Sequence, residues 1–154
     1  PPPPPLFFFT HNPPNQMLRS LVGSEMCIRD SDKREGVIYA IRLDGNIIGT
    51  ISLNWIDWGN KGCGVGYWLA ENLTGNGYVT KSCIRLMEHC FDDLNLHRFV
   101  LEAAVDNVAS CEVAERIGMR LEGITKDREW LYDHYVDAKL YAITKPEWDE
   151  KRSK

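Results

Sequence analysis

The stretch that organises this chain is GYWLAENLTGNGYVTKS, residues 66–82. Its first residues complete a strand predicted over 64–70. Its last residues begin a helix predicted over 78–92, where apolar side chains recur at three- and four-residue spacing. Between them, Gly75 and Gly77 allow a sharp turn whose N–H groups point at a ligand, and the helix dipole adds partial positive charge there. The stretch therefore predicts a strand, a pyrophosphate-binding loop and a helix.

Two glycines before a helix also occur in simple tight loops, which is the commoner origin of such a pattern. Other phosphate-binding motifs do not fit this chain. It has no GxxxxGK[ST] sequence, and Thr80 stands where G-x-G-x-x-G would have its third glycine. A mononucleotide P-loop and a Rossmann site are therefore not supported.

Strands are predicted on both sides of this stretch. Upstream, alternation of apolar and polar residues predicts strands over 37–43 and 47–53, a turn at 44–46 and a polar connection over 55–62. Downstream we expect, in order, a strand over 98–105, a helix over 110–117 ended by Gly118, and strands over 121–128 and 135–144. This order predicts an α+β fold with a mixed, mostly antiparallel sheet flanked by helices.

A second polar segment follows the strand predicted over 98–105. Asn107 comes directly after this strand, and Ser110 stands three residues later where the next helix begins. Such residues often cap helices, because their side-chain oxygens accept hydrogen bonds from free N–H groups. The segment suggests a function only in combination with the glycine loop.

Together these segments resemble the GNAT superfamily of acetyl-CoA-dependent N-acetyltransferases, over residues 36–148. GYWLAENLTGNGYVTKS matches the pyrophosphate loop of that superfamily, and AVDNVASCEVAERIGM matches its N-x-x-S segment. The ending LYDHYVDAKLYAITKPEW is similar to the ribosomal-protein N-terminal serine/alanine acetyltransferases. Three residues depart from the pattern: Asn72 replaces Gln or Arg, Asn76 replaces Lys or Arg, and Met119 replaces Phe.

The resemblance implies acetyl-CoA as a co-substrate. It implies that the third and fourth strands separate near Leu69, that the pantetheine arm inserts there, and that a main-chain N–H close to Leu69 or Ala70 stabilises the oxyanion. Asn107 is expected to bond the pantetheine, and Ser110 to stabilise or protonate the departing thiolate. The cofactor-binding residues expected in this way are Leu69, Ala70, Gly75, Asn76, Gly77, Tyr78, Val79, Asn107 and Ser110.

Two acids are candidates for the general base. Glu129 in DREWLYD matches the acid of the serine-directed relatives, and Glu102 in LEAAV matches that of the alanine-directed relatives. Period two places Glu102 on the face opposite Leu101 and Ala103. A solvated surface carboxylate is the commoner fate of either residue. Glu129 is favoured because its segment is the better match, and Glu102 is kept second.

The pKa of the amine helps to choose the acceptor. An α-amine with a pKa of ~7.7–8.0 is about one tenth neutral at pH 7, whereas a lysine with a pKa of ~10.4 needs roughly 3.5 kcal/mol more to expose its lone pair. We therefore expect acetylation of a protein N-terminus by direct attack in a ternary complex. The alternatives are a polyamine or antibiotic N-acetyltransferase and a catalytically inactive CoA-binding fragment.

Composition and charge argue against several other partners. The chain has 18 Lys+Arg against 22 Asp+Glu, a net charge of −4, and no basic stripe, so no nucleic acid is expected. Its cysteines lack C-x-x-C spacing and its histidines lack partners at metal-ligand spacing, which favours reduced thiols in a cytoplasmic protein without a metal. No membrane segment is predicted, and a homodimer is left open.

The composition also changes along the chain. Seven of the eight prolines lie in the first fourteen residues, and residues 17–31 resemble translated adapter or vector sequence. Residues 1–31 are therefore predicted to be a disordered, non-native leader, with a native proline-rich tail as the alternative. Residues 32–154 are predicted to form the N-acetyltransferase domain without the first strand and two helices of the superfamily.

Overall fold

The computed structural model describes residues 37–154, and the predicted leader over 1–31 lies outside them. The strands are β1 (Val37–Leu43), β2 (Asn46–Asp57), β3 (Gly62–Leu69), β4 (Arg98–Ala104), β5 (Arg120–Leu131) and β6 (His134–Thr144). The helices are the 3₁₀ turn η1 (Glu71–Leu73), α2 (Tyr78–Glu88), its π-helical continuation η2 (His89–Asp93), α3 (Val108–Arg116) and α4 (Lys145–Arg152). The predicted α+β fold is confirmed, with one further helix at the end.

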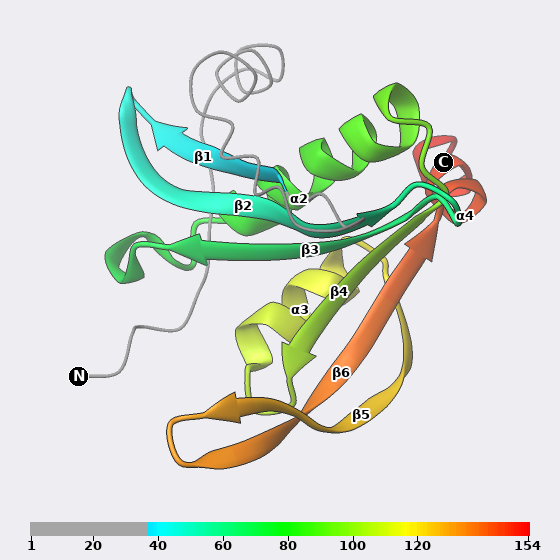
Figure 1. Cartoon of the computed structure of the whole chain (residues 1–154). Helices are drawn as coiled ribbons and strands as arrows, with labels where there is room; N and C mark the ends of the chain where they lie inside the picture. The colour runs from blue at the N-terminus through cyan, green and yellow to red at the C-terminus, as the bar shows by residue number, and fades with distance from the viewer. Residues whose placement is uncertain (1–36) are drawn as a thin grey trace.

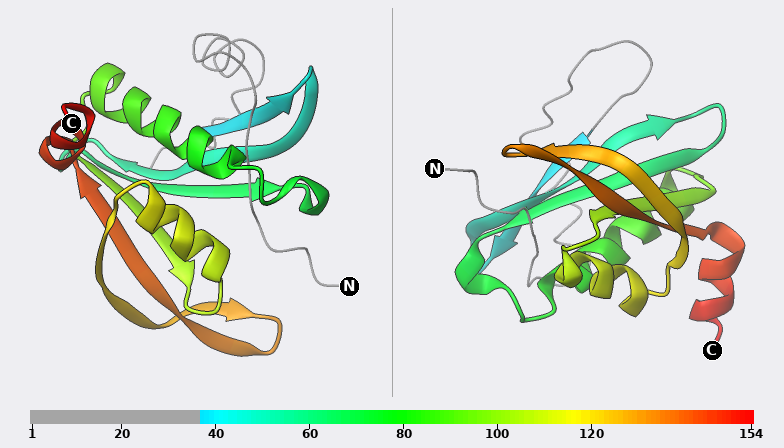
Figure 2. Two further views of the ribbon diagram at one scale, coloured as in Figure 1. Left: turned by 180° about the vertical axis from the view of Figure 1, so that it is seen from behind. Right: turned by 90° about the horizontal axis from the view of Figure 1, so that it is seen from below.

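The strands form a single sheet in the order β1-β2-β3-β4-β6-β5. Among the described strands only β3 and β4 are parallel neighbours, and the other neighbouring pairs are antiparallel. Parallel neighbours need a crossover connection, and α2 lies in the one that joins β3 to β4. Figures 1 and 2 show α2 and α3 on the same face of the sheet, which we call the helix face. The opposite side is called the open face.

Apolar side chains on the helix face form the hydrophobic core. Leu86 and Met87 of α2 and Phe99 and Leu101 of β4 are buried together, and side chains of β1, β2 and β3 belong to the same cluster. Burial of one such side chain contributes about 1.5–3 kcal/mol. Beyond α2, Phe91 lies edge-on to Phe99 with their ring centroids 6.4 Å apart. The core therefore ties α2 to both halves of the sheet.

β2 extends beyond its predicted end, so the predicted connection over 55–62 is too long. The register of β2 against β3 shifts between Leu53 and Trp55, which leaves Asn54 as the extra residue of a β-bulge. Leu53 and Ile56 are therefore both buried, although three positions separate them. The bulge breaks the period of two by which a strand is recognised in a sequence.

β5 likewise runs further than the strand predicted over 121–128. A bulge between Thr125 and Glu129 interrupts its pairing with β6, and Asp127 in this bulge has a left-handed φ of 47°. The Asp137 carboxylate of β6 accepts the N–H of Asp127 at 2.9 Å and pairs with Lys126 at 2.8 Å. These contacts hold the bulge and allow the strand to resume beyond it.

The sequence prediction ends with the last strand and misses α4. A capping box starts this helix, because Glu147 Oε2 accepts hydrogen bonds from both the N–H and the hydroxyl of Thr144 at 2.8 Å. Pro146 in the first turn fits the same pattern. Trp148 then buries its side chain beside Phe91. The signal for this helix was present in the sequence as Thr-x-x-Glu with an early proline.

Glu122 lies in an ion-pair network on β5, the strand at one edge of the sheet. Arg98 and Arg120 donate hydrogen bonds to its carboxylate and hold its pKa at about 2, below the usual 4.5. A lowered folded-state pKa stabilises the protein above pH 4.5, and this stabilisation is lost as the pH falls from 4.5 toward 2. We expect Glu122→Gln to lower the free energy of unfolding by about 1 kcal/mol at pH 7, measured by urea titration.

The matched control is Glu112→Gln, which neutralises an exposed carboxylate on α3. The difference between wild type and Glu122→Gln should shrink below pH 4.5, where the wild-type carboxylate of the unfolded chain takes up a proton. A difference that stays constant with pH, or an equal loss in the control, would contradict the role given to Glu122.

Candidate active site

The central feature of the site is a gap between β3 and β4. These parallel strands pair only over Gly62–Val65 and Arg98–Leu101. Beyond these residues they diverge, as Figure 1 shows, while β3 stays paired with β2 to Leu69 and β4 stays paired with β6 to Ala104. The expected separation of the two strands is confirmed, and it begins at Gly66.

The backbone of Leu69 presents its N–H to this gap. The N–H of Ala70 donates to the Ile48 carbonyl on β2 at 2.9 Å, so it is used on the other side of β3. Successive residues of a strand direct their N–H groups to opposite edges. The Leu69 N–H therefore points toward β4, in the part of β3 where the ladder with β4 has ended. Of the two donors expected from the sequence, the N–H of Leu69 faces the gap, whereas the N–H of Ala70 is bonded to β2.

The glycine loop before α2 has the conformation that the sequence predicts. Gly75 and Gly77 have φ angles of 83° and 74°, which glycine adopts without strain. A Cβ at either position would meet nothing within 4 Å, so the backbone angle rather than space requires glycine. Asn76 donates its Nδ2 to the carbonyls of Leu73 at 3.1 Å and Thr74 at 3.3 Å. Its side chain thus stabilises the loop, and a contact with a ligand would have to come from its backbone.

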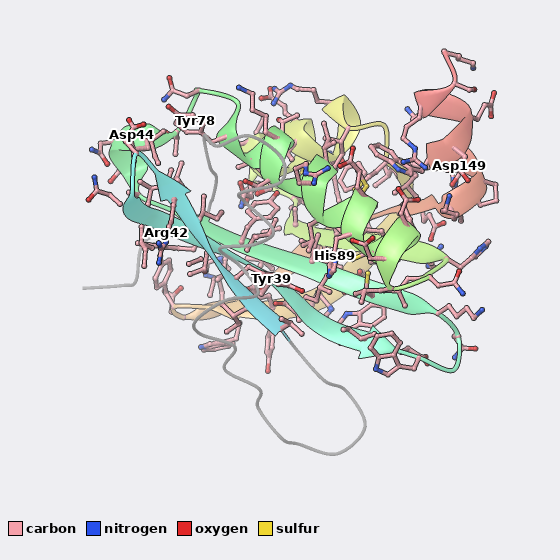
Figure 3. The ribbon with its side chains drawn as sticks, turned by 90° about the horizontal axis from the view of Figure 1, so that it is seen from above. Tyr39, Arg42, Asp44, Tyr78, His89 and Asp149 are labelled. Atoms are coloured by element: carbon pink, nitrogen blue, oxygen red, sulfur yellow. The ribbon has the colours of Figure 1, made fainter. Side chains whose placement is uncertain are left out.

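The first turn of α2 offers backbone N–H groups and positive charge. Gly77 is the N-cap and provides no side-chain cap, so the N–H groups of Tyr78 and Val79 lie at the positive end of the helix dipole. Figure 3 shows Tyr78 at this end of the helix. Arg116 of α3 adds a formal charge, because its Nη1 donates to Thr80 Oγ1 in the same turn at 3.1 Å. This arrangement suits an anion.

Asn107 and Ser110 lie at the start of α3, directly after β4. Asn107 Oδ1 accepts the N–H of Ser110 at 3.3 Å, which is a helix-capping contact. Ser110 is only 4% exposed. Burial raises the pKa of Tyr67 on β3 far above its usual value, and the nearby Ser110 side chain partly offsets this rise. Tyr67 of β3 and Ser110 of α3 therefore lie near each other across the gap.

Glu102 lies on the open face, as period two predicts, because Leu101 and Ala103 belong to the core on the helix face. Arg128 of β5 donates to both of its carboxylate oxygens, from Nε at 2.7 Å and from Nη2 at 3.2 Å. The Glu102 side chain is 27% exposed in this pair. Both carboxylate oxygens of Glu102 are therefore engaged by one guanidinium.

Glu129 stands in a different environment one residue after Arg128. It pairs with Val136 in the β5–β6 ladder, beyond the bulge, and its side chain is exposed. Among residues 37–154 no partner forms a hydrogen bond with its carboxylate. The two acids expected from the sequence thus differ in their surroundings. The carboxylate of Glu102 is bound by an arginine, and that of Glu129 is open to solvent.

Parallel strands explain why the predicted segments meet. The glycine loop follows β3 and the Asn107–Ser110 segment follows β4, so both lie at the carboxyl end of the same strand pair. Sequence reasoning missed Tyr67 and Arg116. Tyr67 shares the strand face of Leu69 by period two and could have been found by that signal. Arg116 carries no such signal, because only packing of α3 beside α2 brings it to the loop.

The described part of the chain contains no metal centre. Within residues 37–154, no group of three His, Cys, Asp or Glu side chains could hold a metal ion. Four free cysteines, Cys63, Cys83, Cys90 and Cys111, are buried there. None of the helices in this range has the length and apolar character needed to cross a membrane.

Known proteins share this sequence and geometry. A ribosomal-protein-serine acetyltransferase of Escherichia coli (strain K12) is 40% identical over 105 residues, which cover 68% of this chain and 59% of the relative. A putative ribosomal N-acetyltransferase of Bacillus subtilis (strain 168) is 34% identical over 117 residues, or 76% of this chain and 64% of the relative. A spermidine N(1)-acetyltransferase of Vibrio cholerae is 26% identical over 116 residues, or 75% of this chain and 66% of the relative. The chain spans about three fifths of the length of the first two relatives.

The fold also matches a solved structure of a ribosomal L7/L12 α-N-protein acetyltransferase in complex with coenzyme A. The TM-score is 0.69 at 37% identity, and the match covers 71% of this chain and 62% of that chain. The profile of the acetyltransferase (GNAT) domain matches residues 7–120, which is more than half of the sequence. The resemblance predicted from the glycine loop is therefore confirmed, and the chain belongs to the GNAT acetyltransferase family.

Proposed function

We propose that this protein transfers the acetyl group of acetyl-CoA to the α-amine of a protein N-terminus, by direct attack within a ternary complex. The observation that carries the proposal is the gap after the last β3–β4 pair, with the Leu69 N–H turned into it and the glycine loop beside it. The names of the ribosomal-protein acetyltransferase relatives support the choice of acceptor.

The groups available for acetyl-CoA fit its chemistry. N–H groups of the Gly75–Gly77 loop and of Tyr78 and Val79 would hold the pyrophosphate, because a helix N-terminus favours an anion. The pantetheine arm would lie in the gap and bond the backbone, with Asn107 as a side-chain partner. The solved relative in complex with coenzyme A supports this assignment.

The reaction needs four events around one carbon atom. The neutral amine nitrogen attacks the thioester carbonyl, a C–N bond forms, and the oxyanion is stabilised by the Leu69 N–H. The C–S bond then breaks and the electron pair leaves with sulfur. Ser110 stabilises the departing thiolate by donating a hydrogen bond from its hydroxyl group and keeps its own proton. The proton lost by the amine passes to Glu129 through water, so charge and atoms balance.

Glu129 is the better candidate for the base because its carboxylate is free. Arg128 holds both oxygens of Glu102, whereas no described partner occupies those of Glu129. An α-amine needs little help, since about a tenth of it is already neutral at pH 7. A polyamine acceptor is the second candidate, and the spermidine N(1)-acetyltransferase relative is the observation that favours it.

A set of matched acceptors tests the proposed function. We expect a peptide with a free N-terminal serine to be acetylated with a kcat/KM at least about tenfold above that of the same peptide blocked at its N-terminus and carrying one lysine, because the lysine is almost fully protonated at pH 7. Release of free coenzyme A thiol measures the rate. A higher rate with the blocked peptide or with spermidine would overturn the choice of acceptor.

Substitution of the two acids tests the base. We expect Glu129→Gln to lower kcat about tenfold to a hundredfold near pH 7, and less above pH 8, where the α-amine loses its proton unaided. The matched variant Glu102→Gln should lower kcat less and show no comparable recovery with pH. Steady-state rates between about pH 6 and pH 9 measure this, and the reverse ranking would assign the base to Glu102.

Gly77→Ala tests the loop without adding a clash. Its φ of 74° is strained for alanine while its surroundings are empty, so the change acts on the backbone alone. We expect coenzyme A to bind about fivefold more weakly or worse, by calorimetry. The control Gly123→Ala adds the same methyl group to open space at an ordinary φ. Equal coenzyme A affinity in both variants would show that the loop does not contribute to coenzyme A binding.

A further inference from the structure

The bulge in β2 places two polar side chains on the open face, beside the gap. Val65 of β3 lies in the core, so its neighbours Gly64 and Gly66 present their empty Cβ positions to the open face. A Cβ on Gly64 would lie 2.2 Å from the Trp55 indole nitrogen, and a Cβ on Gly66 would lie 2.5 Å from Asn54 Nδ2. Trp55 and Asn54 therefore lie flat against the glycines of β3.

The amide of Asn54 is oriented by its neighbour on the same strand. Ser52 Oγ donates to Asn54 Oδ1 at 2.7 Å and lies 3.3 Å from the Gly66 carbonyl. Because the amide oxygen is the accepting end of this bond, the Nδ2 group is left as the donor. Among the described residues Nδ2 has no acceptor, and the side chain is exposed. The fold thus presents a fixed hydrogen-bond donor over Gly66.

This donor lies where the gap opens. Gly66 is the first residue of β3 beyond the last pair with β4, and Glu102 is the first such residue of β4. On the open face, the Asn54 amide of β2 lies over Gly66 on one side of the gap. Glu102 of β4, paired with Arg128, lies on the other side. α2 and α3 cover the helix face. An acceptor that reaches the gap from the open face therefore passes Asn54.

We infer that Asn54 is a specificity-determining residue whose Nδ2 donates to the first peptide carbonyl of the acceptor. This inference rests on the proposed function and deepens it. In an N-terminal residue the carbonyl carbon is separated from the amine nitrogen by the Cα alone, so one donor beside the gap can bind the carbonyl while the amine enters. A polyamine has no carbonyl, and an unfilled contact with Asn54 contributes nothing to its binding. Ser52 acts as a positioning residue for the amide.

Two small acceptors isolate this contact. Serine N-methylamide keeps the first carbonyl, and ethanolamine has the same amine and hydroxyl groups without it. We expect Asn54→Ala to lower kcat/KM for serine N-methylamide about fivefold, which corresponds to one neutral hydrogen bond, and to leave ethanolamine within about twofold of wild type. Ser52→Ala should produce a smaller loss in the same direction. The effect should fall on KM rather than on kcat.

Asn46→Ala, at the other end of β2, is the control and should change neither acceptor. An equal loss for both acceptors in Asn54→Ala, or no loss, overturns the inference while acetyl transfer itself stands. If wild type acetylates neither acceptor, the proposed function fails. An NMR titration of the coenzyme-A-loaded protein with serine N-methylamide then tests the contact with Asn54 separately. Weaker binding by Asn54→Ala supports the inference, and equal or undetectable binding overturns it.

Discussion

The short parallel ladder between β3 and β4 is the constraint on which the site depends. It joins two antiparallel halves, β1-β2-β3 and β4-β6-β5, through four residues of each strand. Each half keeps its own ladder to the ends of its strands, so the two can diverge without losing their other hydrogen bonds. The core beneath, with α2 and α3, holds the halves together where the ladder has stopped. A ladder that continued to Leu69 would use the N–H that now faces the gap.

The same physical principle operates at the gap and at the loop. A folded chain pairs nearly all of its buried backbone N–H groups, and the first N–H groups of a helix have no partner within the helix. Here the Leu69 N–H and the N–H groups of the first turn of α2 lie at the same end of the sheet. The Asn76 side chain and the left-handed glycines stabilise the loop internally. The recognition of an extended, anionic ligand by such donors requires few side chains.

Two β-bulges shape the open face. In β2, Asn54 is the extra residue, and its amide lies over Gly66. In β5, the bulge at Asp127 precedes Arg128, which reaches Glu102 on β4, on the other side of β6. Bulges commonly redirect side chains next to functional sites. Here they bring a neutral donor and an ion pair to opposite sides of the gap.

The order of strands and helices, the glycine loop and the Asn107–Ser110 cap could be predicted from the sequence, because each depends on residues within a few positions of one another. The bulges could not, since an extra residue breaks the period of two and resembles the end of a strand. Nor could the choice between Leu69 and Ala70, because it depends on which edge of β3 pairs with β2. Only the tertiary structure joined Arg128 to Glu102 and separated that acid from Glu129. Such contacts connect residues far apart in the chain, and their partners are chosen by the register of neighbouring strands.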